Sequence, residues 1–159
     1  MVEVGGSHAA EIDHVGTGTA TDAKLAYRGS RNRSQRVVEN AVDQDPYVTV
    51  DDVDVVQSYE NFTIGVMMAV VEHGFCEPEE CSEFFQLENL MAPSGKMPLN
   101  TSGGNLAECY MHGLGLQIEA VRQIRGDSVN QIPGADVALN IAGPMVHHVS
   151  TIIMGSEAT

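Results

Sequence analysis

Basic residues, cysteines and long apolar runs are all scarce in this 159-residue sequence. Lys and Arg number 8 against 22 acidic residues, and the formal net charge of −14 argues against binding to nucleic-acid phosphates. Three cysteines are too few for the disulfide framework of a small secreted domain. Cys76 and Cys81, close to His73, could form half of a metal site, but no second ligand pair follows at useful spacing. We therefore predict no metal.

No apolar run approaches the roughly 18 residues that cross a bilayer. The longest, from Ile64 to Val71, has the size of a helix and contains a glycine. The opening MVEVGGSHAAEIDH lacks the basic start and apolar stretch of a signal peptide. We therefore expect a cytoplasmic protein without a membrane span. The length and the 43% hydrophobic content fit one domain, residues 1–159, with a real core.

Most of the positive charge lies in one stretch between residues 24 and 36. A solvated loop and helix start would explain it, and so would a phosphate-bearing ligand such as coenzyme A or an acidic partner. Both interpretations stay open. The stretch contains Lys24, Arg28, Arg31, Arg33 and Arg36.

Apolar spacing predicts strands alternating with helices, which is typical of an α/β domain with a central sheet. Strands are predicted at residues 2–15, 50–56, 135–142 and 147–154, and an irregular loop at 17–34. Helices are predicted at residues 34–42, 63–74 and, briefly, 79–85. A long helix should run from Gly103-Gly104 to Gly126. Its apolar stripe would be Ala107, Met111, Leu114, Ile118 and Val121.

The Gly103-Gly104 pair begins that helix and exposes backbone N–H groups where the helix dipole favours negative charge. Such a turn can hold a carboxylate, a phosphate or a developing oxyanion, although a simple tight turn has the same sequence. The string around the turn is more specific. It reads PLNTSGGNLAECYMHGLGLQIEAVRQIRG.

That string resembles the thiolase superfamily, and in particular its lipid-transfer-protein or sterol-carrier-protein-x type, in which Asn-Thr-x-Gly-Gly precedes a helix ending in E-A-V-R-Q-L-R-G. VDVVQSYENFTIGVMMAVVEHGFC resembles the family's strand, HDCF- or YDxFT-type motif and following helix. GADVALNIAGPM resembles the strand that leads to the C-x-G loop, and the matches run in order from about residue 50 to 154. The resemblance implies a thiolase-like C-terminal domain with a mixed central sheet and helices on both faces.

The resemblance also implies that the chain is about half of an enzyme. The nucleophilic cysteine of the family belongs to the first half, and nothing here corresponds to it. A second chain or an N-terminal thiolase half is therefore expected as a partner. Some lipid-transfer-type members are aldolases that cut steroid side-chain CoA thioesters together with an OB-fold partner, which implies such a partner here as well.

The departures from the family pattern bear on the chemistry. Tyr110, in Cys109-Tyr110-Met111, takes the place of the Gly-His-Pro histidine, and Tyr59 takes the place of the HDCF histidine. Asn140-Ile141-Ala142 replaces the C-x-G loop, so the acid/base cysteine is missing. His112 and the pair His147-His148 match no thiolase catalytic position. Ordinary thiolysis, which needs an acyl-cysteine and these helpers, is disfavoured.

Retro-aldol cleavage of a β-hydroxyacyl-CoA needs only a proton acceptor for the hydroxyl and donors for the enolate. A tyrosine keeps its proton at neutral pH and suits the donor role. We predict Tyr59 and Tyr110 as catalytic residues in one acyl-CoA pocket. His112 is a weaker third, because on a continuous helix it would lie nearly opposite Tyr110. Substrate-binding residues would be Asn61, Gly103, Gly104 and Gly143.

The predicted ligand is a coenzyme A thioester as substrate, with no permanently bound cofactor. Two other interpretations remain open. The chain could be a non-catalytic acyl-CoA or lipid-binding module or scaffold, in which the tyrosines merely line a cavity. It could also be a truncated fragment that is inactive alone, marked by exposed apolar surface where the other half would pack.

Overall fold

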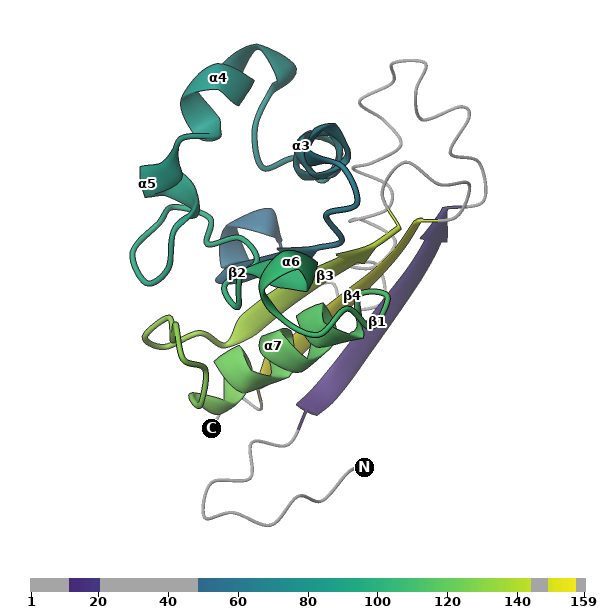
Figure 1. Ribbon diagram of the computed structural model, residues 1–159, viewed down its shortest axis with the longest axis vertical. Coiled ribbons are helices and arrows are strands. Elements are labelled where there is room, and N and C mark those ends of the chain that lie inside the picture. The colour runs from purple at the N-terminus through teal and green to yellow at the C-terminus, as the bar shows by residue number, and fades with distance from the viewer. Residues whose placement is uncertain (1–11, 21–48, 144–148, 157–159) are drawn as a thin grey trace.

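A computed structural model describes residues 12–20, 49–143 and 149–156, and within them one mixed sheet organises the chain (Figure 1). Its strands are β1 (Ile12–Ala20), β2 (Val55–Ser58), β3 (Val137–Ala142) and β4 (Val149–Ser156), in the order β1-β4-β3-β2. β2 and β3 are parallel, whereas β4 pairs antiparallel with both β1 and β3. Parallel β2 and β3 therefore end at the same edge of the sheet.

Helices cover both faces of this sheet, α3 (Thr63–Glu72) on one and α7 (Leu114–Arg125) on the other. Successive strand residues point to opposite faces, so neighbours in sequence enter different cores. Val56 joins the core under α3, and Val55 joins the core under α7. Both are fully buried, as expected for a strand covered on both sides.

Short elements connect these layers. The 3-10 helix η1 (Val50–Asp52) precedes β2, and η2 (Pro78–Glu80), α4 (Cys81–Phe84) and α5 (Leu87–Leu90) follow α3. α6 (Gly104–Ala107) precedes α7. In Figure 1, α4 and α5 lie on the side of the molecule where α3 lies, and α6 lies close to α7.

Several sequence predictions are confirmed. The helix at 63–74 is α3, and Gly74 follows it with a φ of 82°. The short helix near 79–85 is α4, and the strands at 135–142 and 147–154 are the antiparallel pair β3 and β4. The helix predicted at 34–42, and the parts of the predictions that fall on 2–11, 21–33 and 147–148, lie outside the described residues.

Two boundaries were wrong. The strand predicted from residue 50 begins only at Val55, because the side chain of Asp52 accepts hydrogen bonds from the Thr49 N–H and hydroxyl, both at 2.7 Å, and closes a helical turn. The loop predicted at 17–34 starts too early, since residues 17–20 pair with β4. That pairing partner lies more than a hundred residues away, and local composition carries no sign of it.

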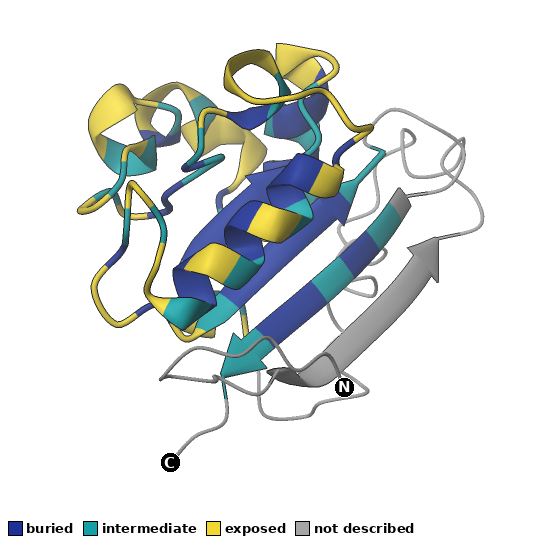
Figure 2. Ribbon diagram, turned by 60° about the horizontal axis from the view of Figure 1, so that its bottom comes forward, coloured by how far each residue is buried: buried dark blue, intermediate teal, exposed yellow. Residues whose placement is uncertain are grey.

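The prediction of one long helix was also wrong, both in its extent and in which face of the helix is buried. It divides into α6 and α7, because His112 and Gly113 take left-handed φ values of 52° and 86°. Leu114 and Ile118 of the predicted buried stripe are 49% and 37% exposed. Figure 2 shows the alternation of exposed and buried residues along α7 as it lies on the sheet. The face of α7 that is buried holds Gly115, Leu116, Glu119, Ala120, Gln123 and Ile124.

Among the described residues, no helix combines the length and the apolar character that a membrane crossing requires. In the same part of the chain, no group of three or more His, Cys, Asp or Glu side chains could hold a metal ion. His73 is buried, with ring nitrogens 2.6 Å from the Ala69 carbonyl and 3.1 Å from the Thr151 hydroxyl. The half-site considered from the sequence is thus a structural histidine beside two free thiols, Cys76 and Cys81.

Candidate active site

Tyr59 and Tyr110 meet at the edge where the two parallel strands end. Tyr59 directly follows β2, and its N–H donates to the Ile141 carbonyl of β3 at 2.9 Å. Tyr110 lies in the connection between α6 and α7. The two hydroxyl groups form a hydrogen bond, and the ring centroids are 6.5 Å apart. The structure thus brings together the two tyrosines that the sequence singled out.

Gly113 allows the start of α7 to approach the Tyr59 ring. A Cβ at this position would stand 2.9 Å from Tyr59 Cδ2, closer than carbon atoms normally come. The φ of 86° is also one that residues with a side chain rarely adopt. Glycine at this position therefore sets the distance between the tyrosine and the helix.

The hydrogen bond with Tyr110 raises the pKa of the Tyr59 hydroxyl, and partial removal from water and the nearby Glu60 charge raise it further. A phenol already keeps its proton at neutral pH. Tyr59 is thus protonated in the resting structure, half-buried beside the exposed Tyr110.

His112 lies beside Tyr110, and Asn61 forms a hydrogen bond with the residue that follows it. The His112 ring is 5.0 Å from the Tyr110 ring, centroid to centroid. The expectation that it would face away from Tyr110 was wrong, because the chain at residues 110–113 is a turn instead of a helix. Asn61 is exposed, and its side-chain oxygen accepts from the Phe62 N–H at 3.1 Å.

The Gly103-Gly104 turn holds a carboxylate that belongs to the chain itself. Glu60 accepts hydrogen bonds from the Asn105 N–H, from the Asn105 side-chain amide at 3.2 Å and from Asn100 Nδ2 at 3.4 Å. A Cβ at Gly104 would collide with that carboxylate. Sequence reasoning anticipated an anion at this helix start but missed Glu60, although it lies next to Tyr59.

Asn100 fixes the end of β2. Its side-chain oxygen accepts from the Ser58 N–H at 2.8 Å, and its Nδ2 donates to the Ser58 carbonyl at 2.9 Å. One amide therefore satisfies both backbone groups of Ser58, in the way that a neighbouring strand would. The residue that precedes Tyr59 is held in place from the side opposite β3. Beyond the Asn-Thr-x-Gly-Gly motif, no pattern in the sequence indicates that Asn100 has this role.

A buried polar network anchors the same turn to α7. Glu119, 2% exposed, accepts hydrogen bonds from the hydroxyls of Thr101 and Ser128, both at 2.6 Å, and from Gln123 Nε2 at 3.0 Å. Gln57 of β2 donates to the Thr101 hydroxyl at 3.0 Å. Buried polar groups joined in this way fix the relative positions of β2, the turn and α7.

Comparison with known proteins identifies the family of this domain. The family described as thiolase C-terminal domain-like matches residues 13–156. The chain belongs to that family. A solved structure, the Ltp2-ChsH2(DUF35) aldolase, superposes on it with a TM-score of 0.77 and 30% identity, covering 93% of this chain and 40% of that one.

Two curated relatives of this thiolase-type domain are named for carbon–carbon cleavage. The 17-hydroxy-3-oxo-4-pregnene-20-carboxyl-CoA lyase of Mycobacterium tuberculosis is 37% identical over 108 residues, which are 68% of this chain and 28% of the relative. The steroid side-chain-cleaving aldolase of Thermomonospora curvata is 40% identical over 99 residues, which are 62% of this chain and 25% of the relative. The acetyl-CoA acetyltransferase of Methanothermobacter thermautotrophicus is 31% identical over 102 residues. The chain thus spans about a quarter of the length of the curated relatives it matches.

One alignment with the thiolase pattern needs correction. Asn140, Ile141 and Ala142, compared above with the C-x-G loop, lie inside β3, and Asn140 is buried opposite Gln57 of β2. Gly143, with a φ of 70°, directly follows the strand. Gly143 therefore lies at the same edge of the sheet as Tyr59. His147 and His148 fall outside the described residues.

Proposed function

We propose that this chain is the C-terminal half of a thiolase-type aldolase that cleaves a carbon–carbon bond in β-hydroxyacyl-CoA thioesters. The observation that carries the proposal is the hydroxyl-to-hydroxyl hydrogen bond between Tyr59 and Tyr110 at the edge where β2 and β3 end. Both phenols occupy positions at which the family pattern has histidines. The names of two curated relatives, a lyase and an aldolase of steroid side chains, support the same reaction class.

A pair of hydrogen-bonded phenols suits retro-aldol cleavage. The β-hydroxyl of the substrate gives its proton to Tyr110, Tyr110 passes its own proton to Tyr59, and Tyr59 protonates the α-carbon. The bond between the α- and β-carbons breaks, its electrons form the thioester enolate, and the β-carbon becomes a carbonyl. Every proton is accounted for, and neither phenol has to be ionised at rest. The raised pKa of Tyr59 keeps this phenol protonated until the enolate forms.

The other proposed residues act around this pair. His112, with its ring against Tyr110, is placed to orient that phenol. Asn61, Gly103, Gly104 and Gly143 are proposed to contact the CoA thioester, on the strength of the resemblance. Coenzyme A enters as part of the substrate, with no other cofactor in the proposal.

The chain also has the surface expected of half an enzyme. Apolar side chains within four residues of the two tyrosines in sequence are exposed, among them Leu106 at 93% and Phe62 at 62%. Met111, which precedes α7, and Leu114 and Ile118 on α7 are exposed as well. Patches of this kind mark protein contacts. We propose that the remaining thiolase half covers it and that an OB-fold protein completes the assembly; the two-part name of the related solved aldolase supports a second chain.

The test is an assay of the complete assembly, the chain together with a cysteine-bearing thiolase half and the OB-fold partner. Release of ketone and shorter acyl-CoA from a β-hydroxyacyl-CoA should fall about 100-fold or more in Tyr59→Phe and in Tyr110→Phe, as when one oxyanion donor is removed. Val129→Ala, at a 98% exposed apolar position, serves as the control. Unchanged cleavage in both Phe variants would reject the proposal.

Acyl transfer is the second candidate, because one relative is named as an acetyl-CoA acetyltransferase. Adding free coenzyme A and a 3-ketoacyl-CoA to the same assembly distinguishes it, since only thiolysis consumes both. If the chain binds a CoA thioester and no combination of partners turns it over, the binding-module interpretation replaces both enzymes. An assembly that neither binds nor converts the thioester would favour the interpretation that the chain is a truncated fragment.

A further inference from the structure

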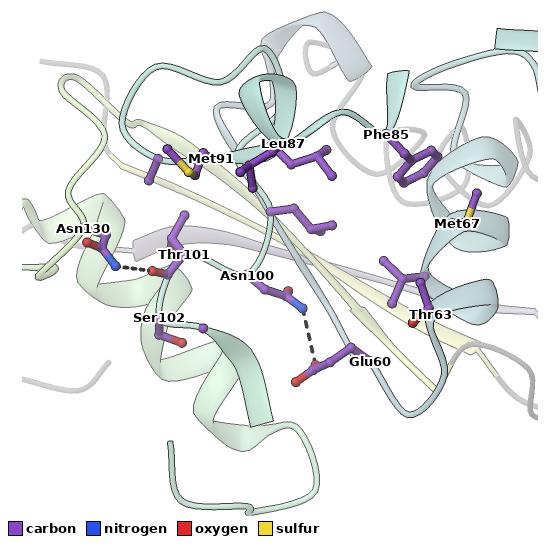
Figure 3. A pocket seen from close by; sticks show the side chains of 15 residues that line it. Glu60, Thr63, Met67, Phe85, Leu87, Met91, Asn100, Thr101, Ser102 and Asn130 are labelled. Carbon is purple, nitrogen blue, oxygen red and sulfur yellow. Dashed lines mark hydrogen bonds between the residues drawn. The ribbon is translucent and has the colours of Figure 1, made fainter. Parts of the chain in front are cut away.

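Glu60 ties the segment after β2 to the turn that contains Asn100 and Asn105. Its carboxylate accepts hydrogen bonds from the Asn105 N–H and from the side-chain amides of both asparagines. Figure 3 shows the Asn100 amide and the Glu60 carboxylate directed toward each other. Because Asn100 also binds Ser58, both sequence neighbours of Tyr59 are held by one turn. The backbone at Tyr59 is therefore fixed from both directions along the chain.

These contacts suit a carboxylate better than a neutral side chain of the same size. A carboxylate only accepts hydrogen bonds, whereas a glutamine would present its own NH2 group to at least one of the donors. All three donors are uncharged groups, so they hold the carboxylate without pairing its charge. Hydrogen bonds to a charged acceptor are also roughly twice as strong as neutral ones. Gly104 leaves room for Glu60, because a Cβ there would collide with it.

The charge of Glu60 also acts on the Tyr59 hydroxyl. The hydrogen bond with Tyr110 is the largest cause that raises the pKa of this phenol, followed by partial removal from water and then by charge interactions with Tyr110 and Glu60. A negative charge near a phenol disfavours its ionisation, because the tyrosinate would be a second negative charge. Glu60 therefore helps Tyr59 to keep its proton.

We infer that Glu60 is a positioning residue for the proton transfer: its carboxylate, held by the Asn100 turn, fixes Tyr59 in place and keeps that phenol protonated until the enolate accepts the proton. Glu60 acts through Tyr59 and needs no contact with the substrate. The role in the reaction rests on the proposed function, whereas the effect of the charge on Tyr59 does not.

The first test needs no turnover. Carbon-13 NMR of the full 159-residue chain, labelled at tyrosine Cζ, follows the ionisation of each phenol, and Tyr59→Phe identifies the Tyr59 signal. Tyr110→Phe serves as the background, because it removes the phenol whose titration is coupled to that of Tyr59. In this background Glu60→Gln should make Tyr59 titrate at lower pH, and Glu60→Asp, which keeps the charge, should shift it less. Glu88→Gln removes the same charge from an exposed position on α5 and should leave Tyr59 unchanged.

The second test uses the complete assembly with both tyrosines present. Glu60→Gln should lower kcat about tenfold or more with little change in KM, because a displacement of about 1 Å at a reacting group costs up to roughly 100-fold in rate. The alkaline limb of the kcat pH profile should move to lower pH, since Tyr59 loses its proton earlier. Glu60→Asp should keep the limb closer to that of the wild type, and Glu88→Gln should match the wild type in rate and profile.

Circular dichroism melting identifies a variant that fails to fold, and Glu60→Ala, which removes the same charge, then replaces Glu60→Gln. An unchanged Tyr59 titration in the folded variant, or equal shifts in Glu60→Gln and Glu60→Asp, would overturn the inference. A shifted titration beside an assembly that cleaves no thioester would remove the proposed function and leave the effect of Glu60 on Tyr59 standing. Cleavage by Glu60→Gln with the kcat and pH profile of the wild type would remove the inference alone.

Discussion

The side-chain amide of Asn100 binds both backbone groups of Ser58, one residue before the tyrosine proposed to donate the proton. Asn100 adopts a left-handed φ of 49°, a conformation that asparagine tolerates better than most residues. A single residue thereby supplies hydrogen-bond partners to the end of β2, which would otherwise be unpaired on the side opposite β3. The position of Tyr59 depends on this contact and on the hydrogen bond to Ile141.

We expect Asn100→Ala to lower the free energy of unfolding by about 1–3 kcal/mol, because two part-buried backbone groups of Ser58 lose their partner. Urea unfolding measures this. Asn100→Asp keeps the acceptor for the Ser58 N–H but places a charge beside Glu60 and the Ser58 carbonyl. It should therefore recover none of the loss at neutral pH and part of it at acidic pH. Equal stability of all three proteins would contradict the role.

Gly104→Ala should destabilise the fold by more than the left-handed backbone alone requires, because its methyl group would collide with the Glu60 carboxylate. Gly134→Ala is the matched control: its φ of 74° resembles the 68° of Gly104, and nothing lies within 4 Å of the added Cβ. The difference between the two losses isolates the collision. Glu60→Ala in the Gly104→Ala background should recover that difference, and a failure to do so would place the strain elsewhere.

Stability should fall with acid below pH 6.5 because of His73. Burial lowers the pKa of its imidazole from the ordinary value of 6.5, while the hydrogen bond to Ala69 opposes the shift. Below 6.5 the unfolded chain binds a proton that the folded chain does not, so the free energy of unfolding decreases by up to about 1.4 kcal/mol per pH unit until the folded pKa is reached.

Unfolding free energies measured between pH 5 and 8 check this, with His73→Gln as the comparison. Glutamine retains hydrogen-bonding groups and does not titrate, so the slope contributed by the imidazole should disappear in the variant. A slope identical in both proteins would assign the acid sensitivity to other groups.

The cysteines should react with iodoacetamide at different rates. Burial raises the pKa of the Cys76 thiol to about 11, and the neighbouring Cys81 adds to the effect, so few thiolates form at pH 8. Cys109 is exposed. Mass spectrometry should show Cys109 alkylated before Cys76, and Cys109→Ser should lose the early adduct. Early modification of Cys76 in the folded protein would contradict its burial.

The parts that could be predicted from the sequence are those in which local pattern and tertiary structure agree. Ile64 to Val71 has helical spacing and lies in α3, and the apolar run at 135–142 contains β3. The tyrosine pair could be predicted only through the family pattern, since 51 positions separate the two residues.

The orientation of α7 could not be predicted, because its inner face contains Glu119 and Gln123, residues that hydropathy assigns to solvent. Their burial depends on hydrogen-bond partners in Thr101 and Ser128, which come from two other segments. Glu60 and Asn100 were missed for the same reason. Each works through a contact about forty residues distant in sequence, and such contacts leave no periodicity.

On α7, the residues that hold the helix in place are different from the residues that face outward. Glu119 and Gln123 join it to β2 and the Thr101 turn, so Leu114 and Ile118 contribute little to keeping it there. Outward positions of this kind can change over generations without unfolding the domain. In the proposed assembly, partner choice can thus diverge among descendants while the residues proposed to transfer protons stay the same.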